Sequence, residues 1–322
     1  MPRHVRHRPL VGATGATGVA VVSGVLVAGV AAAATLTVVF SPAQVAPLPV
    51  TGKDLQSLTS VLGLSGSGLW GSKSVSVSQA DGSTPPPTTG TAVSPTGPTG
   101  PVGTRTWAYG TILWSTRPRP TKTTSLRAAE SAAGMTVALP TTLPAGVQGP
   151  PTYLALQRTT ATVAFDAAAG PTLDGSTLTL DVGPGILAEY GGALGDTGGS
   201  GQTAGFSGIP TLAVATMPRP TATSTGATMT QLESFILGRP GFPQALAQEI
   251  RLLGNLQAIL PVPVPSGVSE TSTTVAGSTA VVLSVAGGTA SGVVWEDHDG
   301  AVHTVGGVLD QQDVLGVARQ LG

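Results

Sequence analysis

The chain begins with a long apolar segment. Between Leu10 and Phe40 the sequence contains no charged residue and no amide side chain. A helix rises about 1.5 Å per residue and a bilayer core is about 30 Å thick, so about 20 such residues can cross a membrane. Residues 1–9 contain arginines and no acidic residue, which favours a cytoplasmic position for this tail. The pattern therefore predicts a single-pass membrane protein with a transmembrane helix at residues 10–40, a cytoplasmic N-terminus and an extracytoplasmic C-terminal domain.

A cleaved signal peptide is the alternative interpretation of this segment. It would also begin with basic residues, continue with an apolar stretch and end near small residues such as Ala31–Ala34. The apolar region of a signal peptide usually has about 7 to 15 residues, and the stretch here is roughly twice as long, which favours a retained anchor. Both interpretations place the remaining chain outside the cytoplasm.

Residues 41–103 are predicted to connect the membrane helix to a folded domain. Four apolar residues have helical spacing and indicate a short helix next to the membrane: Leu55, Leu58, Val61 and Leu62. From Ala80 to Gly103 the sequence is rich in proline, threonine and glycine, which offer little to bury. This second stretch is predicted to be an extended or disordered linker.

The pattern of residues 104–322 predicts an α+β domain in which an antiparallel sheet is covered by a few helices. The aromatic-rich segment Thr104–Ser115 is expected to be its first strand. Four short runs rich in β-branched residues lie between Thr152 and Thr216 and predict further strands. Near the end of the chain, Asp299-Gly300 predicts a tight turn. The strands expected in this last part are Val275–Val285, Gly292–Glu296 and Val302–Val305.

Helices are predicted where a capping residue precedes apolar residues at helical spacing. Ser125 is expected to cap a helix that ends at Gly134, and Asp310 to cap the C-terminal helix. Thr230 and Glu233 are predicted to form a capping box, and another helix is expected from Pro243. The prolines in Met135–Val147 favour an extended segment there, and a second proline-rich segment, Pro261–Pro265, follows the predicted helical pair.

Charge and composition exclude several classes of protein. The three arginines before the apolar segment belong to 15 basic residues, against 16 acidic ones, so the chain after Phe40 carries a net charge of about −4. Nucleic-acid binding is not expected, because it needs clustered cations. The chain has no cysteine, which excludes disulfides, thiol catalysis and a lipidated cysteine.

No motif for catalysis or for a cofactor stands out. Ser65, Ser200 and Ser207 each lack the second glycine of a nucleophile elbow, and the glycine-rich stretch near residue 200 lacks the lysine of a phosphate-binding loop. His298 and His303 lie beside acidic residues that could ligate a metal, but the acids are also typical of a hairpin turn. No catalytic residue, cofactor or metal is therefore predicted.

The best candidates for a ligand or partner surface are aromatic. They are Trp107, Tyr109, Trp114, Trp295 and His303. Tyrosine and tryptophan combine a large apolar ring with a polar group, which suits a ligand groove. A core position is the alternative for Trp295 and His303, because Trp295 goes with Val293 on its predicted strand and His303 shares a face with Val305.

Several segments resemble a family. They are LRAAESAAGMTVALPTTLPAGV, ATVAFD, LDGSTLTLDVGPGILAEYGG, PGFPQALAQEIRLL with the following PVPVP, and SGVVWEDHDGAVHTVGGVLDQQDVLGVARQL. Between about Leu126 and Leu321 the chain resembles actinobacterial membrane-anchored proteins of unknown function, whose extracytoplasmic domain is similar to those of anti-sigma-factor-like and lipoprotein-carrier-like proteins. The resemblance implies a non-enzymatic sensing or binding domain that acts through a partner, and it implies no catalytic residues. No sigma-binding domain precedes the predicted span, so the resemblance does not extend to a complete anti-sigma factor.

The sequence therefore predicts a membrane-anchored extracytoplasmic protein that senses or binds a lipid, a small apolar ligand or an envelope protein. An envelope hydrolase is the alternative, with paired carboxylates among Asp166, Asp181 and Glu189. A structural surface protein is a third possibility.

Overall fold

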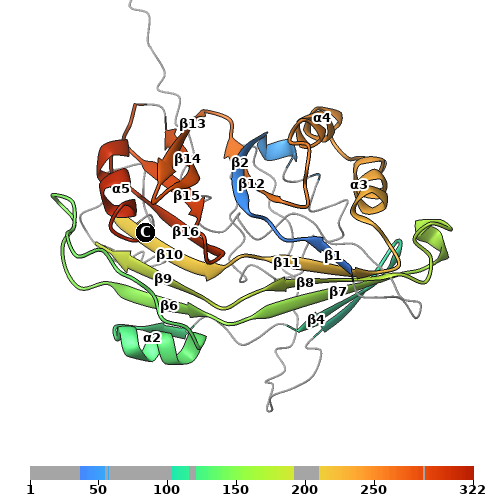
Figure 1. Ribbon diagram of the computed structural model, residues 1–322, viewed down its shortest axis with the longest axis horizontal. Helices are drawn as coiled ribbons and strands as arrows, with labels where there is room; N and C mark the ends of the chain where they lie inside the picture. The colour runs from blue at the N-terminus through green and yellow to red at the C-terminus, as the bar shows by residue number, and fades with distance from the viewer. Residues whose placement is uncertain (1–36, 55–56, 58–102, 116–120, 192–209, 286) are drawn as a thin grey trace, which may run out of the picture.

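The computed structural model describes residues 37–54, 57, 103–115, 121–191, 210–285 and 287–322 (Figure 1). Strands dominate this part of the chain. They form a six-stranded sheet in the order β1-β11-β8-β7-β4-β3, an eight-stranded sheet in the order β13-β14-β15-β16-β10-β9-β6-β5, and a two-stranded sheet of β12 and β2. All pairs in the two large sheets are antiparallel, so the expected single sheet is in fact two.

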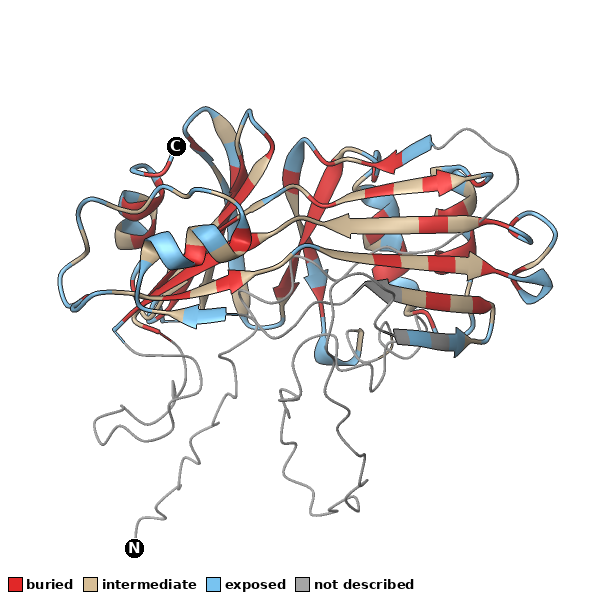
Figure 2. Cartoon of the chain, turned by 90° about the horizontal axis from the view of Figure 1, so that it is seen from below, coloured by how far each residue is buried: buried red, intermediate tan, exposed pale blue. Residues whose placement is uncertain are grey.

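Three long bent segments run through both large sheets (Figure 1). Each consists of two strands separated by two residues: β6 (Thr152–Leu156) and β7 (Thr159–Phe165), β8 (Thr177–Val182) and β9 (Gly185–Tyr190), and β10 (Leu212–Pro218) and β11 (Thr221–Thr225). Their order is the same in the two sheets, β11-β8-β7 in one and β10-β9-β6 in the other. In β6, β7 and β11 buried residues alternate with less buried ones (Figure 2), which is the period of two expected for strands with one face on a core. β9 is buried at all six positions.

The six-stranded sheet is completed at its two edges. β1 (Thr37–Phe40) pairs with β11, and the hairpin of β3 (Gly103–Trp107) and β4 (Gly110–Ser115) pairs with β7. The single strand expected at Thr104–Ser115 is therefore a hairpin. Its turn residues, Ala108 and Tyr109, interrupt what the sequence presents as one apolar run.

The predicted transmembrane helix is contradicted. Its last four residues, Thr37–Phe40, form β1, and Val39 and Phe40 are buried in the core. Within the described residues, no helix has both the length and the apolar character needed to cross a membrane. The predicted single-pass anchor, with a cytoplasmic N-terminus and an extracytoplasmic domain, therefore has no support from this structure. Residues 1–36 lie outside the described residues.

The two-stranded sheet is built from proline-rich segments. β2 (Gln44–Val50) and β12 (Ile259–Pro265) are parallel, and Leu48 lies opposite Pro263. In a parallel pair, only alternate residues of a strand turn their N–H toward the partner. The prolines of both strands occupy the other positions, so their missing N–H groups face away from the ladder and no further strand can join. The sequence analysis expected no strand in either segment.

The eight-stranded sheet ends in a meander of hairpins. Its remaining strands are β5 (Thr121–Thr123), β13 (Val268–Val275), β14 (Ser278–Val285), β15 (Ser291–Glu296) and β16 (Ala301–Gly307). The predicted strands Gly292–Glu296 and Val302–Val305 are confirmed, with the turn at Asp299-Gly300 between β15 and β16. The strand predicted at Val275–Val285 is confirmed only from Ser278, because Ala276 and Gly277 form the turn between β13 and β14. β13 was missed, because its outward residues are polar and exposed.

Helices cover the sheets from both sides (Figure 1). α2 (Leu126–Ala133) packs against β6, and α5 (Gln311–Ala318) packs against β15 and β16. α3 (Met229–Leu237) and α4 (Gln244–Leu252) contribute to the core of the six-stranded sheet, together with β2 and β12. A second core lies between the eight-stranded sheet, α2 and α5.

The capping residues were predicted with mixed success. Ser125 caps α2 as expected, and Gly134 ends it with φ of 71°. Asp310 caps α5 as expected. The capping box of α3 is made by Thr228 and Gln231 and not by Thr230 and Glu233, because Thr228 is the residue that remains extended before the first turn.

Candidate functional site

The tip of the β3–β4 hairpin presents two aromatic residues beside the core. Trp107 pairs with Gly110, which leaves Ala108 and Tyr109 as the turn. A Cβ atom at Gly110 would lie 1.9 Å from the carbonyl oxygen of Ala164 in β7, so only glycine allows the hairpin to approach that strand. The Tyr109 carbonyl also accepts a hydrogen bond from the N–H of Asp166. The turn is therefore held firmly against the end of β7.

An aromatic cluster joins this turn to α3. The Trp107 and Tyr109 rings meet edge to face, with centroids 4.9 Å apart, and Phe235 of α3 meets Tyr109 at 5.5 Å. Phe165 at the end of β7 completes the cluster, 4.9 Å from Phe235. Edge-to-face contacts of this kind add to the apolar burial of each ring. The cluster therefore fixes the position of α3 relative to the hairpin.

Arg239 follows the C-terminus of α3 and lies over this cluster. Its guanidinium carbon is 3.5 Å from the centroid of the Phe235 ring and 4.3 Å from that of Tyr109. Its Nε atom donates a 3.0 Å hydrogen bond to the Phe235 carbonyl, one of the last carbonyls of the helix. A cation so placed on ring faces is attracted by their negative centres.

A pocket of about 450 Å³, partly open to solvent, lies beside this cluster. We call it the aromatic–arginine pocket. It is lined by Ser57, Trp107, Ala108, Tyr109, Arg239, Pro240 and Gly241. Trp107, Tyr109 and Arg239 are half-buried, so each presents part of its surface to the pocket. A volume of this size accommodates a small organic molecule.

The structure places the five predicted surface residues in different environments. Trp107 and Tyr109 line the aromatic–arginine pocket. Trp114 lies in β4 opposite Ala161, and its side chain is outside the described part of the structure. Trp295 and His303 are buried in the eight-stranded sheet, with 0% and 6% of their surfaces exposed, and they stack on each other. The five residues therefore do not form one surface.

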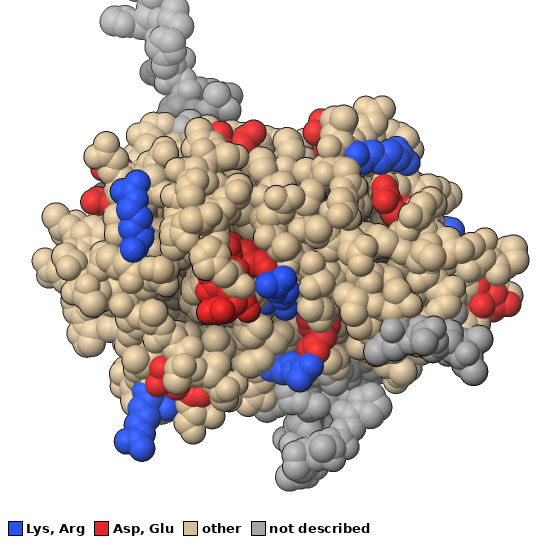
Figure 3. Space-filling view, in the orientation of Figure 1, with Lys and Arg blue, Asp and Glu red and all other residues tan. Residues whose placement is uncertain are grey.

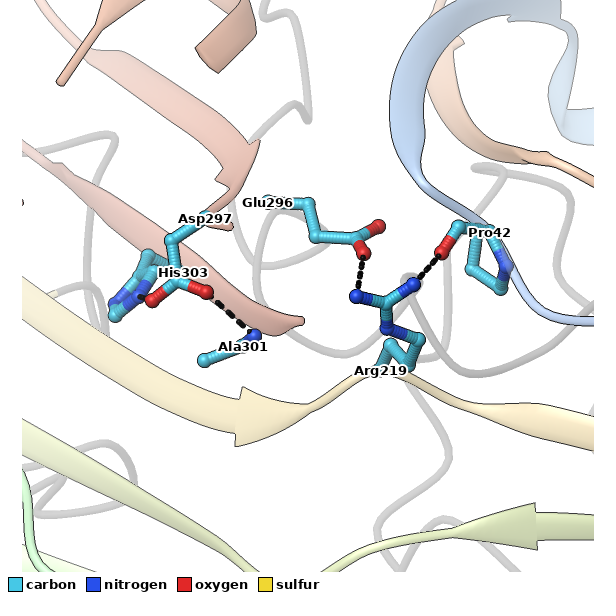
Figure 4. Close-up of polar contacts among 6 residues, drawn as sticks. All are labelled: Pro42, Arg219, Glu296, Asp297, Ala301 and His303. Atoms are coloured by element: carbon cyan, nitrogen blue, oxygen red, sulfur yellow. Dashed lines mark hydrogen bonds and ion pairs between the residues drawn. The ribbon is translucent and has the colours of Figure 1, made fainter. Parts of the chain in front are cut away.

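His303 is the centre of a buried chain of hydrogen bonds. Its Nε2 atom lies 2.9 Å from Asp297 Oδ2, and its Nδ1 atom lies 3.1 Å from the hydroxyl of Thr216 in β10. Figure 4 shows His303 and Asp297 side by side, with Asp297 also accepting from the Ala301 N–H at 2.8 Å. Burial tends to raise the pKa of Asp297, but the hydrogen bonds from His303 and from backbone N–H groups lower it overall.

The Thr216–His303–Asp297 chain has the residue types of a hydrolase triad, but a substrate could not reach it. Thr216 is 8% exposed, so its hydroxyl has little room to meet a substrate. Asp297 serves the turn between β15 and β16, because it accepts from Ala301 and its carbonyl accepts from Gly300. The chain therefore fixes β10 to the tip of this hairpin.

A second polar contact joins the two large sheets. Arg219 lies at the bend between β10 and β11, and its Nη2 atom is 3.1 Å from Glu296 Oε1 at the end of β15. Its Nη1 atom donates a 2.8 Å hydrogen bond to the carbonyl of Pro42, between β1 and β2 (Figure 4).

Charged side chains are sparse on the face of the molecule drawn in Figure 3, and acidic and basic ones lie next to each other near its middle.

Glu296 makes stability depend on pH. Burial raises its pKa from 4.5 to about 6, with Arg219 opposing the shift and Asp297 adding to it. The folded state therefore binds more protons than the unfolded state between about pH 4.5 and 6. The contribution of this group to the free energy of unfolding is fully present below pH 4.5 and is lost as the pH rises through about 6. A difference of this size corresponds to about 2 kcal/mol.

We expect the Glu296→Gln variant to remove this dependence. The free energy of unfolding of both proteins would be measured with urea at pH 4 and at pH 7.5. The wild-type value minus the variant value should be about 2 kcal/mol smaller at pH 7.5 than at pH 4. Glu270→Gln, at an exposed position of β13, is the control. A difference in free energy of unfolding that is the same at both pH values, or larger at pH 7.5, would contradict the prediction.

The structure does not bring together the three acids considered for a hydrolase. The Asp166 side chain caps the short helix Ala167–Ala169 by accepting from Ala168 N–H. Asp181 in β8 is paired with Arg158. Glu189 is buried in β9, eight residues further along the same bent segment, which is a path of roughly 25 Å for extended chain. The described residues also contain no group of three or more His, Asp or Glu side chains that could hold a metal ion.

The sequence analysis missed Arg239 and Phe235. It assigned neither residue to a candidate site. The available signal was an arginine directly after Gly238, where a basic side chain often returns to the last carbonyls of a helix. Nothing in the sequence indicates that these carbonyls lie beside the hairpin of Trp107 and Tyr109.

A scan against protein-family models finds no match, and searches of curated proteins and of solved structures also find none.

Proposed function

We propose that this protein is a non-catalytic binding domain that holds a small, largely apolar ligand in the aromatic–arginine pocket. The observation that carries the proposal is the position of Trp107 and Tyr109, which are held at the rim of a 450 Å³ pocket with part of each ring exposed. A binding role is also what the resemblance described above implies.

The lining of the pocket favours binding over catalysis. The rings of Trp107 and Tyr109 offer flat apolar surface, and the Ser57 and Tyr109 hydroxyls offer hydrogen bonds that could orient a ligand. Ligand sites commonly combine an apolar lining with a few polar groups in this way. No carboxylate or imidazole lies among the described lining residues, so none of them can act as a general base of the usual kind.

Blocking the pocket should strongly weaken the binding of an uncharged apolar probe. N-phenyl-1-naphthylamine becomes fluorescent in apolar surroundings, and titration with the full chain should give saturable binding. Ala108 is exposed at the hairpin turn and lines the pocket, so Ala108→Phe should fill the space without disturbing a core residue. We expect the dissociation constant to rise at least tenfold, because roughly 1.4 kcal/mol of lost contact is enough for that change.

The control is Ala128→Phe, which adds the same ring at an exposed position of α2. Circular dichroism should show the same folded structure for the wild type and both variants. Equal probe binding by Ala108→Phe and the wild type, or no saturable binding by the wild type, would overturn the proposed function.

A further inference from the structure

We propose that the ligand of the aromatic–arginine pocket carries an anionic group, a carboxylate, sulfonate or phosphate, which binds Arg239 while the apolar part of the ligand lies on Trp107 and Tyr109. The inference rests on the proposed function and names the chemical class of its ligand.

The first argument is that Arg239 is already held in one orientation. The guanidinium group rests on the faces of Phe235 and Tyr109, and the bond from Nε to the Phe235 carbonyl fixes its rotation. A planar guanidinium that is held in this way loses little conformational freedom when it binds an anion. The site is therefore organised before the ligand arrives.

The second argument is that most of its donors remain unused by the described residues. A guanidinium has five N–H bonds, and the hydrogen bond to Phe235 uses one of them. Within the part of the chain that the structure describes, Arg239 forms no ion pair, whereas Arg158 and Arg219 each have a carboxylate. The two terminal nitrogens can therefore present parallel donors to a pair of oxygens, the geometry in which arginine binds carboxylates and phosphates.

Capping of α3 is the alternative role for Arg239. It explains the bond from Nε, since a basic side chain at a helix C-terminus is favourable. The negative end of the helix also offsets part of the arginine charge, equivalent to roughly half an elementary charge. Capping does not explain why the guanidinium lies between a ring of the hairpin and a ring of the helix, at a pocket lined by further aromatic surface.

Two related probes separate the anionic group from the apolar body. 8-Anilinonaphthalene-1-sulfonate carries the same ring system as N-phenyl-1-naphthylamine with an added sulfonate. We expect the full chain to bind the sulfonate probe more tightly at low salt, and Ala108→Phe to prevent binding of both probes. The preference for the sulfonate should decrease as salt is added, because the pocket is partly open to solvent.

Substitution of Arg239 should then weaken binding of the charged probe far more than binding of the uncharged one. Arg239→Gln should raise the dissociation constant of the sulfonate probe roughly tenfold or more, since charge-assisted hydrogen bonds are lost. Binding of the uncharged probe should weaken several-fold less than that of the sulfonate, and Arg239→Lys should restore part of the sulfonate affinity because it keeps the charge without the planar fork. Arg251→Gln, at an exposed position of α4, makes the same change of net charge and is the matched control.

The outcomes distinguish the two proposals. If the uncharged probe binds in the pocket but the sulfonate adds no affinity, or if Arg239→Gln weakens both probes equally, the anionic ligand is wrong and the binding function stands. Sulfonate binding that survives Ala108→Phe would place the anion elsewhere and would also overturn the inference. If neither probe binds the wild type, both proposals fail.

Discussion

Replacement of Trp295 with alanine is expected to lower the free energy of unfolding by about 3–5 kcal/mol, the usual cost of deleting a buried tryptophan. Trp295 is 0% exposed and belongs to the core between the eight-stranded sheet, α2 and α5. Its ring stacks on His303 with centroids 4.9 Å apart, so its loss leaves a cavity on one side of the Thr216–His303–Asp297 chain. Urea unfolding followed by far-ultraviolet circular dichroism would measure the change.

Two further substitutions test this interpretation. Trp295→Phe keeps an aromatic ring on His303 and should cost less than half as much as alanine, because a smaller volume is removed. Leu252→Ala deletes a large side chain that is 79% exposed, and it should change the stability by no more than about 0.5 kcal/mol. A loss below 1 kcal/mol for Trp295→Ala would show that this residue is not part of a packed core.

The Arg219→Met variant is expected to be less stable than the wild type by about 3 kcal/mol at pH 7.5. The substitution leaves Glu296, whose side chain is 1% exposed, as a buried charge without its cation, and removing one partner of a buried pair is costly. It also removes the hydrogen bond to the Pro42 carbonyl. Urea unfolding at several pH values would measure both effects.

The pH dependence identifies the cause. The pKa of Glu296 is already about 6 in the presence of Arg219, which lowers it, so in the variant this carboxyl should be neutral at pH 4.5. The loss at pH 4.5 should then fall to about 1 kcal/mol, the value of a hydrogen bond. The double variant Arg219→Met with Glu296→Gln should recover part of the loss at pH 7.5. A loss that is the same at both pH values would mean that the buried charge is not responsible.

Local signals in the sequence located several elements correctly. The extended serine before α2 and the glycine after it, Ser125 and Gly134, fixed both ends of that helix, because capping depends only on neighbouring residues. Asp299-Gly300 located the hairpin turn for the same reason: Gly300 has φ of 80°, a conformation that few other residues adopt. Trp107 and Tyr109 were chosen on side-chain chemistry alone, and both line the aromatic–arginine pocket. Their role as a ligand surface stays a prediction.

The N-terminal error has a physical explanation. An apolar run without charges is compatible with a membrane helix and with a strand buried in a protein core, and the periodicity of a short run does not distinguish them. Only the pairing with β11, about 185 residues later in the chain, shows that Thr37–Phe40 is a strand and not part of a helix. The linker predicted at residues 80–103 lies almost entirely outside the described residues, as does the glycine-rich stretch near residue 200.

The sequence by itself determined which residues can cap, turn, alternate and carry charge, because these properties depend on each residue and its close neighbours. Tertiary structure alone decided that the prolines of β2 and β12 meet in one parallel pair, that three bent segments join two sheets, and that Arg239 lies on Tyr109. Each of these contacts joins segments that are distant in the chain, and each depends on how the sheets pack. No local pattern records that packing, which is why the aromatic–arginine pocket becomes visible only in the folded chain.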